Sequence, residues 1–339
     1  MKDSPSLSFA GLALSPLLLQ NLASLGYAEM TPVQAQSLPH ILEGRDVIAQ
    51  ARTGSGKTVA FGLGLLSQLD PSLIRLQALV LCPTRELADQ VSKEIRRLAR
   101  SVPNVKVLTL CGGLPLRPQV DSLEQHDPHI VVGTPGRIQE LLRKRHLHLT
   151  HLKMLVLDEA DRMLDMGFED QINEIIGKAP VQRQTLLFSA TYPEEIRAIS
   201  HKVQRKPLEV TVDTVDSAHA IEQTFFEVAP ERKIDALASL LTEYEPESVV
   251  VFCNTKIDTG EVAEALRQRR FSVLALQGDL EQRDRDEVLL RFANRSCSVL
   301  VATDVAARGL DIKDLAAVIN FELPKDPDVH LHRIGRTGR

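Results

Sequence analysis

The chain has 339 residues, 43% of them hydrophobic, which is enough to build two ordinary hydrophobic cores. A formal net charge of -5, an aromatic content of 4% and the lack of tryptophan argue against a basic polyanion binder and against base-stacking nucleic-acid modules. There is no long apolar run, signal-like start or paired cysteine spacing, so we expect a cytoplasmic protein with reduced thiols, and neither a membrane span nor secretion.

Short apolar runs alternate with helical patterns in the first part of the chain. Buried parallel strands are predicted at residues 47–51, 78–82, 105–110, 130–133, 154–158, 185–188 and 208–212. Helices are predicted between them at 57–68, 85–100 and 171–178. This alternation is typical of an open, doubly wound parallel sheet, so an α/β domain is expected at 1–212.

A polar stretch at 213–220 interrupts this rhythm and is interpreted as a linker to a second domain at 221–339. The alternation then restarts, with strands predicted at 223–228, 249–253, 273–276, 299–303 and 317–321, and helices at 232–241, 259–270 and 284–293. Only the first domain contains a glycine-rich loop. A single nucleotide site is therefore expected, completed by charged groups at strand ends of the second domain.

A glycine-rich loop and a carboxylate each follow a predicted strand of the first domain. The loop reads Ala51-Arg52-Thr53-Gly54-Ser55-Gly56-Lys57-Thr58. Its glycines let backbone N–H groups turn onto phosphate oxygens, while Lys57 supplies a charge and Thr58 a hydroxyl ligand for Mg2+. Asp158 ends a later strand, where it can hold the metal through its water shell. A glycine turn and an acidic helix start without a ligand explain either motif alone, but the two together favour a nucleotide site.

Glu159 follows Asp158 directly and is expected to face elsewhere, with its carboxylate free to position the attacking water. Phosphoryl transfer depends mostly on positioning and electrostatics, so one such carboxylate, with cations on the γ-phosphate, is sufficient. The alternative is an exposed residue at the start of a helix.

The run Asp158-Glu159-Ala160-Asp161, together with the loop, resembles the DEAD-box ATP-dependent RNA helicases of superfamily 2. Further motifs of that family follow in its order, at 31–34, 83–88, 112–113, 134–137, 189–191, 251–255, 282–285, 302–311 and 332–339. Segments 81–91 and 278–286 are most similar to a bacterial member that acts in assembly of the large ribosomal subunit. The resemblance implies two tandem RecA-like doubly wound domains, the second truncated at its C-terminal end, because the chain stops inside the last motif.

The resemblance places a Q motif at 7–35, in which Phe9, Tyr27 and Gln34 contact the nucleotide and ATP is preferred over GTP. A tyrosine can stack on adenine, and a glutamine amide can read the edge of the purine. The alternative is that Tyr27 packs behind a turn and Gln34 caps a helix.

Arg333, Arg336 and Arg339 recur at intervals of three, so on a helix they would share one face. Such a stripe is usually solvated when it stands alone. Within the family pattern, Arg336 and Arg339 resemble arginine fingers that stabilise charge in the transition state, and Gly309 and Asp311 resemble the contact to the ribose.

The family pattern also implies residues that couple the nucleotide to RNA and residues that hold RNA. The coupling residues are Asp161, Ser189, Thr191 and His332. The RNA-binding candidates lie where strands end and helices begin: Pro83, Thr84, Arg85, Gly113, Thr134, Pro135, Gly136, Arg137, Gln282, Arg285 and Thr303. Such contacts grip the sugar-phosphate backbone and tolerate many sequences.

The sequence therefore predicts an ATP-dependent RNA helicase that binds ATP, Mg2+ and RNA. Ribosomal RNA and ribosome assembly intermediates are the expected partners, and DNA is not expected. Two alternatives stay open: an ATP-gated RNA clamp that scaffolds without unwinding, and a DNA helicase or another phosphate-loop ATPase.

Overall fold

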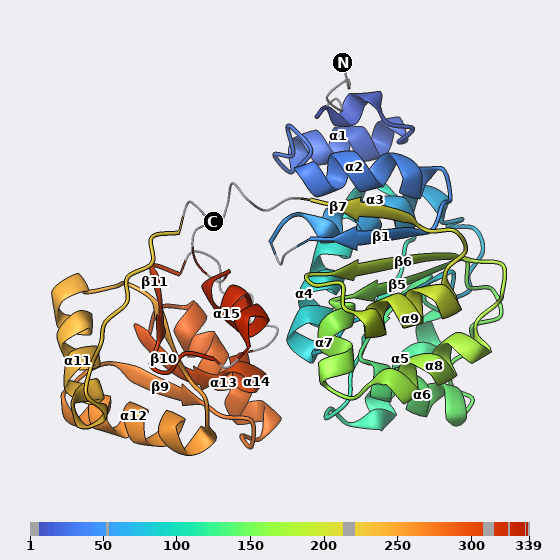
Figure 1. Cartoon of the computed structure of the whole chain (residues 1–339). Helices are drawn as coiled ribbons and strands as arrows, with labels where there is room; N and C mark the ends of the chain where they lie inside the picture. Colours follow the sequence, from blue (N-terminus) through green and yellow to red (C-terminus); the bar gives the residue numbers. More distant parts are fainter. Residues whose placement is uncertain are drawn as a thin grey trace. The chain divides into compact units, whose positions relative to one another are not determined.

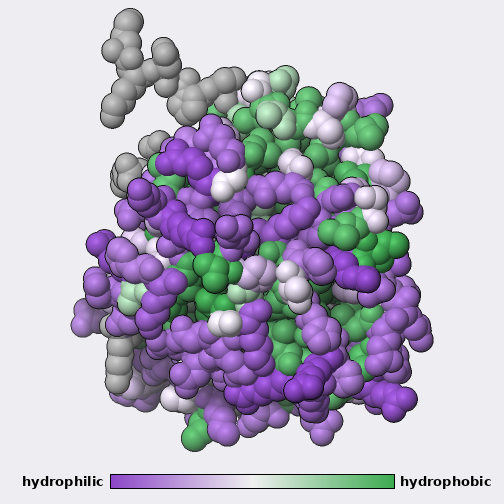
Figure 2. Space-filling view, turned by 90° about the vertical axis from the view of Figure 1, so that its right-hand side faces the viewer, coloured by the Kyte–Doolittle hydropathy of each residue, from purple (hydrophilic) through white to green (hydrophobic). Residues whose placement is uncertain are grey.

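The computed structural model describes residues 7–51, 54–212, 221–307, 315–324, 326–335 and 337, and the chain forms two compact units, Met1–Asp213 and Thr214–Arg339 (Figure 1). The segment 213–220, predicted as a linker, lies outside the described residues. Within the described ranges, no helix combines the length and the apolar character needed to cross a membrane. The face seen in Figure 2 is mostly hydrophilic, with hydrophobic residues in separate patches.

The first unit contains a seven-stranded sheet, ordered β3-β4-β2-β5-β6-β1-β7, in which neighbouring strands are parallel. Its strands are β1 (Val47–Gln50), β2 (Ala78–Leu81), β3 (Val107–Leu110), β4 (Ile130–Gly133), β5 (Met154–Asp158), β6 (Gln184–Ser189) and β7 (Leu208–Thr211). All seven were predicted from their apolar runs, because a parallel sheet covered on both faces buries every side chain of its central strands.

Helices cover both faces of this sheet (Figure 1). Along β5, Met154 and Val156 pack into one core with the helices α1 (Pro16–Ser24), α2 (Pro32–Leu42), α3 (Lys57–Gln68) and α4 (Arg85–Leu98). Leu155 and Leu157 face the opposite core, which includes α5 (Leu116–His126), α6 (Pro135–Arg143), α7 (Ala160–Asp165), α8 (Glu169–Lys178) and α9 (Glu194–Val203). The alternation follows from the two-residue period of a strand.

The second unit contains a four-stranded parallel sheet, ordered β11-β8-β10-β9. The strands are β8 (Val249–Cys253), β9 (Val273–Leu276), β10 (Val299–Thr303) and β11 (Ala317–Asn320), close to their predicted bounds. The helices are α11 (Lys233–Tyr244), α12 (Lys256–Gln268), α13 (Gln282–Ala293), α14 (Asp304–Ala307) and α15 (Pro327–Ile334). Single 3-10 turns lie at Phe9–Gly11, Ala99–Ser101 and Pro230–Arg232. The two α/β units confirm the predicted fold class.

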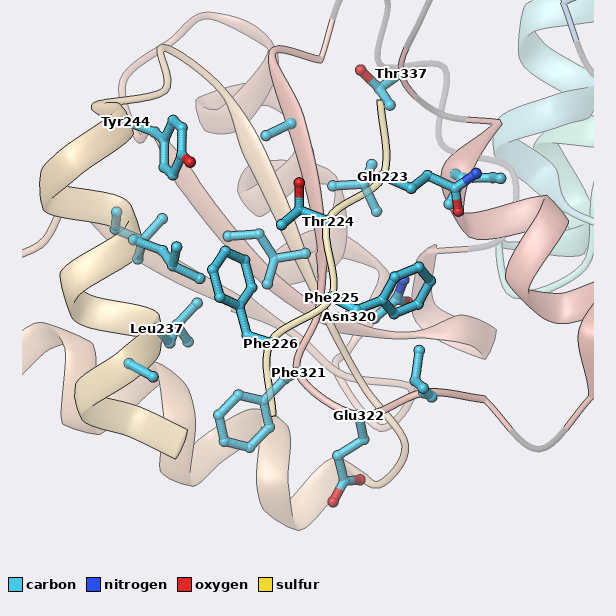
Figure 3. A pocket seen from close by; sticks show the side chains of 18 of the residues that line it. Gln223, Thr224, Phe225, Phe226, Leu237, Tyr244, Asn320, Phe321, Glu322 and Thr337 are labelled. Atoms are coloured by element: carbon cyan, nitrogen blue, oxygen red, sulfur yellow. The ribbon is translucent and has the colours of Figure 1, made fainter. Parts of the chain in front are cut away.

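The strand predicted at 223–228 is wrong. This segment is extended, but no described strand pairs with it. It lines a cavity of about 910 Å³ together with α11 and β11, and Figure 3 shows Phe226 directed toward α11 and Phe225 away from it. Phe226 and Phe225 are 56% and 71% exposed. The residue types favour an extended chain, but a strand also requires a partner for its backbone hydrogen bonds.

Candidate active site

The glycine-rich loop connects β1 to α3 and places Lys57 in the first turn of that helix. Gly54 and Gly56 have φ angles of 84° and 93°, which a residue with a side chain rarely adopts. A Cβ at Gly56 would also meet the Gln34 amide. The first turn of a helix has backbone N–H groups without partners within the helix, so the fold presents a phosphate-binding geometry. Arg52 and Thr53, also predicted here, lie outside the described residues.

Gln34 is hydrogen-bonded to the glycine-rich loop. Its Oε1 accepts a hydrogen bond from the Thr31 backbone N–H at 2.9 Å, which caps α2, and its Nε2 donates to the Gly56 carbonyl at 3.0 Å. Both ends of the amide are therefore engaged inside the protein. This agrees with the helix-capping alternative and adds a contact to the phosphate loop. Because the amide has two N–H donors and two acceptor lone pairs, one donor and one lone pair remain for a further partner such as a purine.

Tyr27 and Phe9 pack within the first unit. The Tyr27 hydroxyl donates to Glu94 Oε1 at 2.6 Å, and the Arg97 guanidinium lies 5.5 Å from the centre of its ring. Burial, and then the hydrogen bond to Glu94, raise the pKa of Tyr27 to about 12. Phe9 is buried in the core. Tyr27 therefore packs within the first unit, as its packing alternative expects, and the contacts of Phe9 and Tyr27 with a nucleotide stay a prediction.

Lys57 and Asp158 face each other at the centre of the site. Lys57 Nζ lies 3.7 Å from Asp158 Oδ1, too far for a hydrogen bond, and both side chains are buried. Neither of these two atoms has a hydrogen-bond partner among the described residues. Burial raises the pKa of Asp158 to about 6, although the nearby Lys57 charge acts to lower it. Unsatisfied buried polar atoms are rare, and here they mark a place where phosphate oxygens and a hydrated metal fit.

Glu159 is buried and hydrogen-bonded, so it is not the exposed residue of the alternative, while its role toward water stays a prediction. The residue is 3% exposed, and Arg162 Nη1 donates to its Oε2 at 2.9 Å. Its φ of 53° and ψ of 54° are left-handed, because the chain turns sharply from β5 into α7. A non-glycine residue held in this conformation is strained, and such strain concentrates at functional sites.

Asp161 joins the end of β5 to the end of β6. Its Oδ2 accepts hydrogen bonds from the backbone N–H groups of Ala190 and Thr191, at 3.0 and 2.9 Å, and from the Thr191 hydroxyl at 3.1 Å. Its own backbone N–H donates to Ser189 Oγ at 3.3 Å. Three of the four predicted coupling residues are thus connected by hydrogen bonds. The fourth, His332, lies in α15.

The RNA-binding candidates of the first unit gather where β3, β4 and β2, neighbours in the sheet, end. Thr134 Oγ1 accepts from the Gly112 backbone N–H at 3.1 Å, and Arg137 Nη2 donates to the Leu114 carbonyl at 2.8 Å. Gly113 has a φ of 70°, and a Cβ there would overlap the Arg85 guanidinium.

Pro83 and Thr84 precede α4 in this group, and Pro135 and Gly136 begin α6. Arg137 Nη1 is buried, and it donates to no part of the chain that the structure describes.

The candidates of the second unit are only partly brought together. Arg285 Nη2 donates to the Ala306 carbonyl at 2.6 Å, and Thr303 Oγ1 accepts from the Ala306 backbone N–H at 3.3 Å. Gln282 instead donates along its own helix to Asp286, at 2.7 Å. Gly309, Asp311, Arg336 and Arg339 lie outside the described residues.

Arg333 does not belong to an exposed arginine stripe, since α15 ends at Ile334 and Arg333 is 1% exposed. Its guanidinium binds both carboxylate oxygens of Asp304, at 2.6 and 2.7 Å. It also donates to Asn254, Asn320 and the Glu322 carbonyl. The sequence could not reveal this, because the spacing of three fits an exposed and a buried arginine equally well.

Comparison with known proteins gives a consistent picture. Residues 31–199 match the family model of the DEAD/DEAH box helicases, and residues 232–339 match that of the helicase conserved C-terminal domain. The chain is 62% identical to the ATP-dependent RNA helicase DbpA of Escherichia coli, covering 96% of this chain and 71% of DbpA. It is 45% identical to the DEAD-box ATP-dependent RNA helicase CshA of Bacillus anthracis, covering 98% of this chain and 63% of CshA.

Solved structures match over nearly the whole chain. S. cerevisiae Dbp5 bound to RNA and ADP BeF3 has a TM-score of 0.88 at 32% identity, over 98% of this chain and 87% of Dbp5. A DEAD box protein from Methanococcus jannaschii has a TM-score of 0.60 at 39% identity, over 98% of this chain and 90% of that protein. These matches agree with the fold and with the motifs read from the sequence.

Proposed function

The chain belongs to the DEAD-box family of ATP-dependent RNA helicases, and from this premise we propose that it binds ATP with Mg2+ and RNA, separates RNA duplexes locally, and hydrolyses ATP to release the RNA. The buried pair of Lys57 and Asp158, with unused hydrogen-bonding atoms at the start of α3, carries this proposal.

In this proposal Lys57 meets the β- and γ-phosphates, and Thr58 and Asp158 hold Mg2+. The metal, when bound, neutralises charge on the phosphate oxygens. Glu159 orients the attacking water and accepts its proton. Arg336 and Arg339 keep their predicted role as arginine fingers, on the strength of the family pattern.

RNA is held by its backbone. Arg137 has a buried donor atom, Nη1, without a hydrogen-bond partner among the described residues, at the start of α6, and Arg85 begins α4; phosphate oxygens are the natural acceptors at such helix N-termini. Contacts to phosphate do not distinguish one base from another, so this binding should tolerate many RNA sequences. A contact to the 2'-hydroxyl would favour RNA over DNA. The network around Asp161 would couple this grip to the nucleotide.

The biological setting is proposed from the likeness to DbpA, which extends over 96% of the chain. By the resemblance seen in the sequence, we place the protein in the cytoplasm, acting on ribosomal RNA during assembly of the large subunit. The chain spans 63% of the length of CshA, so these roles are proposed for the whole protein.

Strand displacement separates this function from its alternatives. We would measure release of a labelled strand from an RNA duplex, and from the DNA duplex of the same sequence, with and without ATP. The proposal expects ATP-dependent release from RNA and little from DNA. Tight ATP-dependent binding without release would instead favour a clamp, and release from DNA would favour a DNA helicase.

A further inference from the structure

A buried ion pair lies beside the proposed catalytic carboxylate. Arg162 and Glu159 are 4% and 3% exposed, and Arg162 Nη1 lies 2.9 Å from Glu159 Oε2. The two residues are three positions apart, so the first turn of α7 brings them onto the same side. Arg162 is absent from the set of residues that the sequence patterns singled out.

Stability alone is a poor reason for such a pair. Taking two charges out of water is costly, and well-packed apolar side chains of similar size often stabilise a core as well or better. The adjacent Met163 is fully buried, so apolar packing is available at this helix. The hydrogen bond that Arg162 donates to the Glu159 carboxylate therefore suggests a role in orienting that carboxylate.

The neighbouring contacts show what the pair can fix. Glu159 sits in a left-handed conformation between β5 and α7. Asp161 anchors the same turn to residues 189–191 and accepts a hydrogen bond from the Arg162 backbone N–H at 3.0 Å. The backbone of Arg162 is thus held in place, and its guanidinium holds one carboxylate oxygen of Glu159.

We propose that Arg162 is a positioning residue that sets the orientation of the Glu159 carboxylate for activating water. This inference rests on the proposed function, because it requires Glu159 to act on the water. A misplacement of about 1 Å in a reacting group can lower a rate by about 10²-fold. Arg162→Gln should therefore lower kcat for RNA-stimulated ATP hydrolysis by about 10- to 100-fold, while KM for ATP changes by less than about threefold, because the phosphate-binding residues are untouched.

A double-mutant cycle in the full chain tests this directly, with single-turnover ATP hydrolysis measured for Arg162→Gln, Glu159→Gln and the double variant. If Arg162 acts through Glu159, Arg162→Gln should lower the rate further by less than about twofold once Glu159 is glutamine. Arg162→Lys keeps the charge but donates from a single point, so its rate should lie between wild type and Arg162→Gln. Arg143→Gln, which breaks an exposed pair with Glu174 on the same unit, is the control and should leave the rate unchanged.

Thermal unfolding of each variant shows whether it folds; if Arg162→Gln does not, Arg162→Lys carries the same cycle. An equal loss from the Arg162 change in both backgrounds would overturn the inference, as would an unchanged kcat. A Glu159→Gln variant with wild-type turnover would instead refute the proposed role of Glu159, so the two failures are distinguishable.

Discussion

Arg333→Met tests whether the buried guanidinium organises the second unit. The substitution leaves Asp304 without its bidentate partner and removes a donor from Asn254 and from Asn320. Breaking a buried ion pair costs about 3–5 kcal/mol. The Asp304 side chain is 27% exposed, so water can compensate in part, and we expect the lower end, about 3 kcal/mol.

Hydrogen exchange measured strand by strand is the appropriate assay, since two units can unfold separately. A loss of about 3 kcal/mol should speed exchange in β8 and β10 by about 10²-fold, while β5 and β6 of the first unit stay unchanged. Arg267→Met, which removes an exposed pair with Glu264, should cost at most about 1 kcal/mol. Adding Asp304→Asn to Arg333→Met should restore part of the loss, because it removes the uncompensated charge. Exchange in β8 and β10 within twofold of wild type would refute the reasoning.

Three further predictions concern the site itself. Glu159→Gln keeps the size of the side chain but removes its charge. ATP should therefore still bind, while the rate of ATP hydrolysis falls by at least about 10²-fold and the complex with RNA lives longer in the presence of ATP. Equal losses of ATP affinity and turnover would instead make Glu159 a ligand of the metal. Burial raises the pKa of Asp158 to about 6, so more of this carboxyl group is protonated as the pH falls through that value. The Mg2+ concentration for half-maximal ATP hydrolysis should therefore rise at low pH. A pH-independent Mg2+ requirement would contradict this prediction. In competition binding at fixed salt, a ribosomal RNA hairpin should be preferred over unrelated RNAs by less than about tenfold, because the proposed contacts are to the RNA backbone; a stronger preference would place sequence specificity within the two units.

Much of the fold was readable from the sequence because parallel strands leave a plain signal. Residues 154–158 are apolar up to their final aspartate, and the structure makes them β5, buried throughout. The prediction of a strand at 223–228 was wrong because a strand needs a partner strand to pair with, and local amino-acid composition does not reveal whether one is present.

The site was predictable at the level of motifs and not at the level of side-chain partners. Lys57 and Asp158 are far apart in the sequence and meet because the loop after β1 leads to Lys57 while β5 ends at Asp158, and the ends of parallel strands lie at one edge of the sheet, where α/β folds usually bind ligands. In contrast, three features depend on rotamers and tertiary contacts: the hydrogen bond from Gln34 to the loop, the pairing of Glu159 with Arg162, and the burial of Arg333. The order of residue types along the chain does not reveal such side-chain contacts.

The central claim, that the loop and carboxylate of the first unit bind ATP for RNA-stimulated hydrolysis, is tested most directly by Lys57→Ala. The variant loses the charge that meets the β- and γ-phosphates, so RNA-stimulated ATP hydrolysis should be abolished and nucleotide binding weakened. Lys93→Ala, which removes an exposed lysine paired with Asp89 in the same unit, should hydrolyse ATP at the wild-type rate. Unchanged turnover in Lys57→Ala, with RNA stimulation intact, would contradict the account.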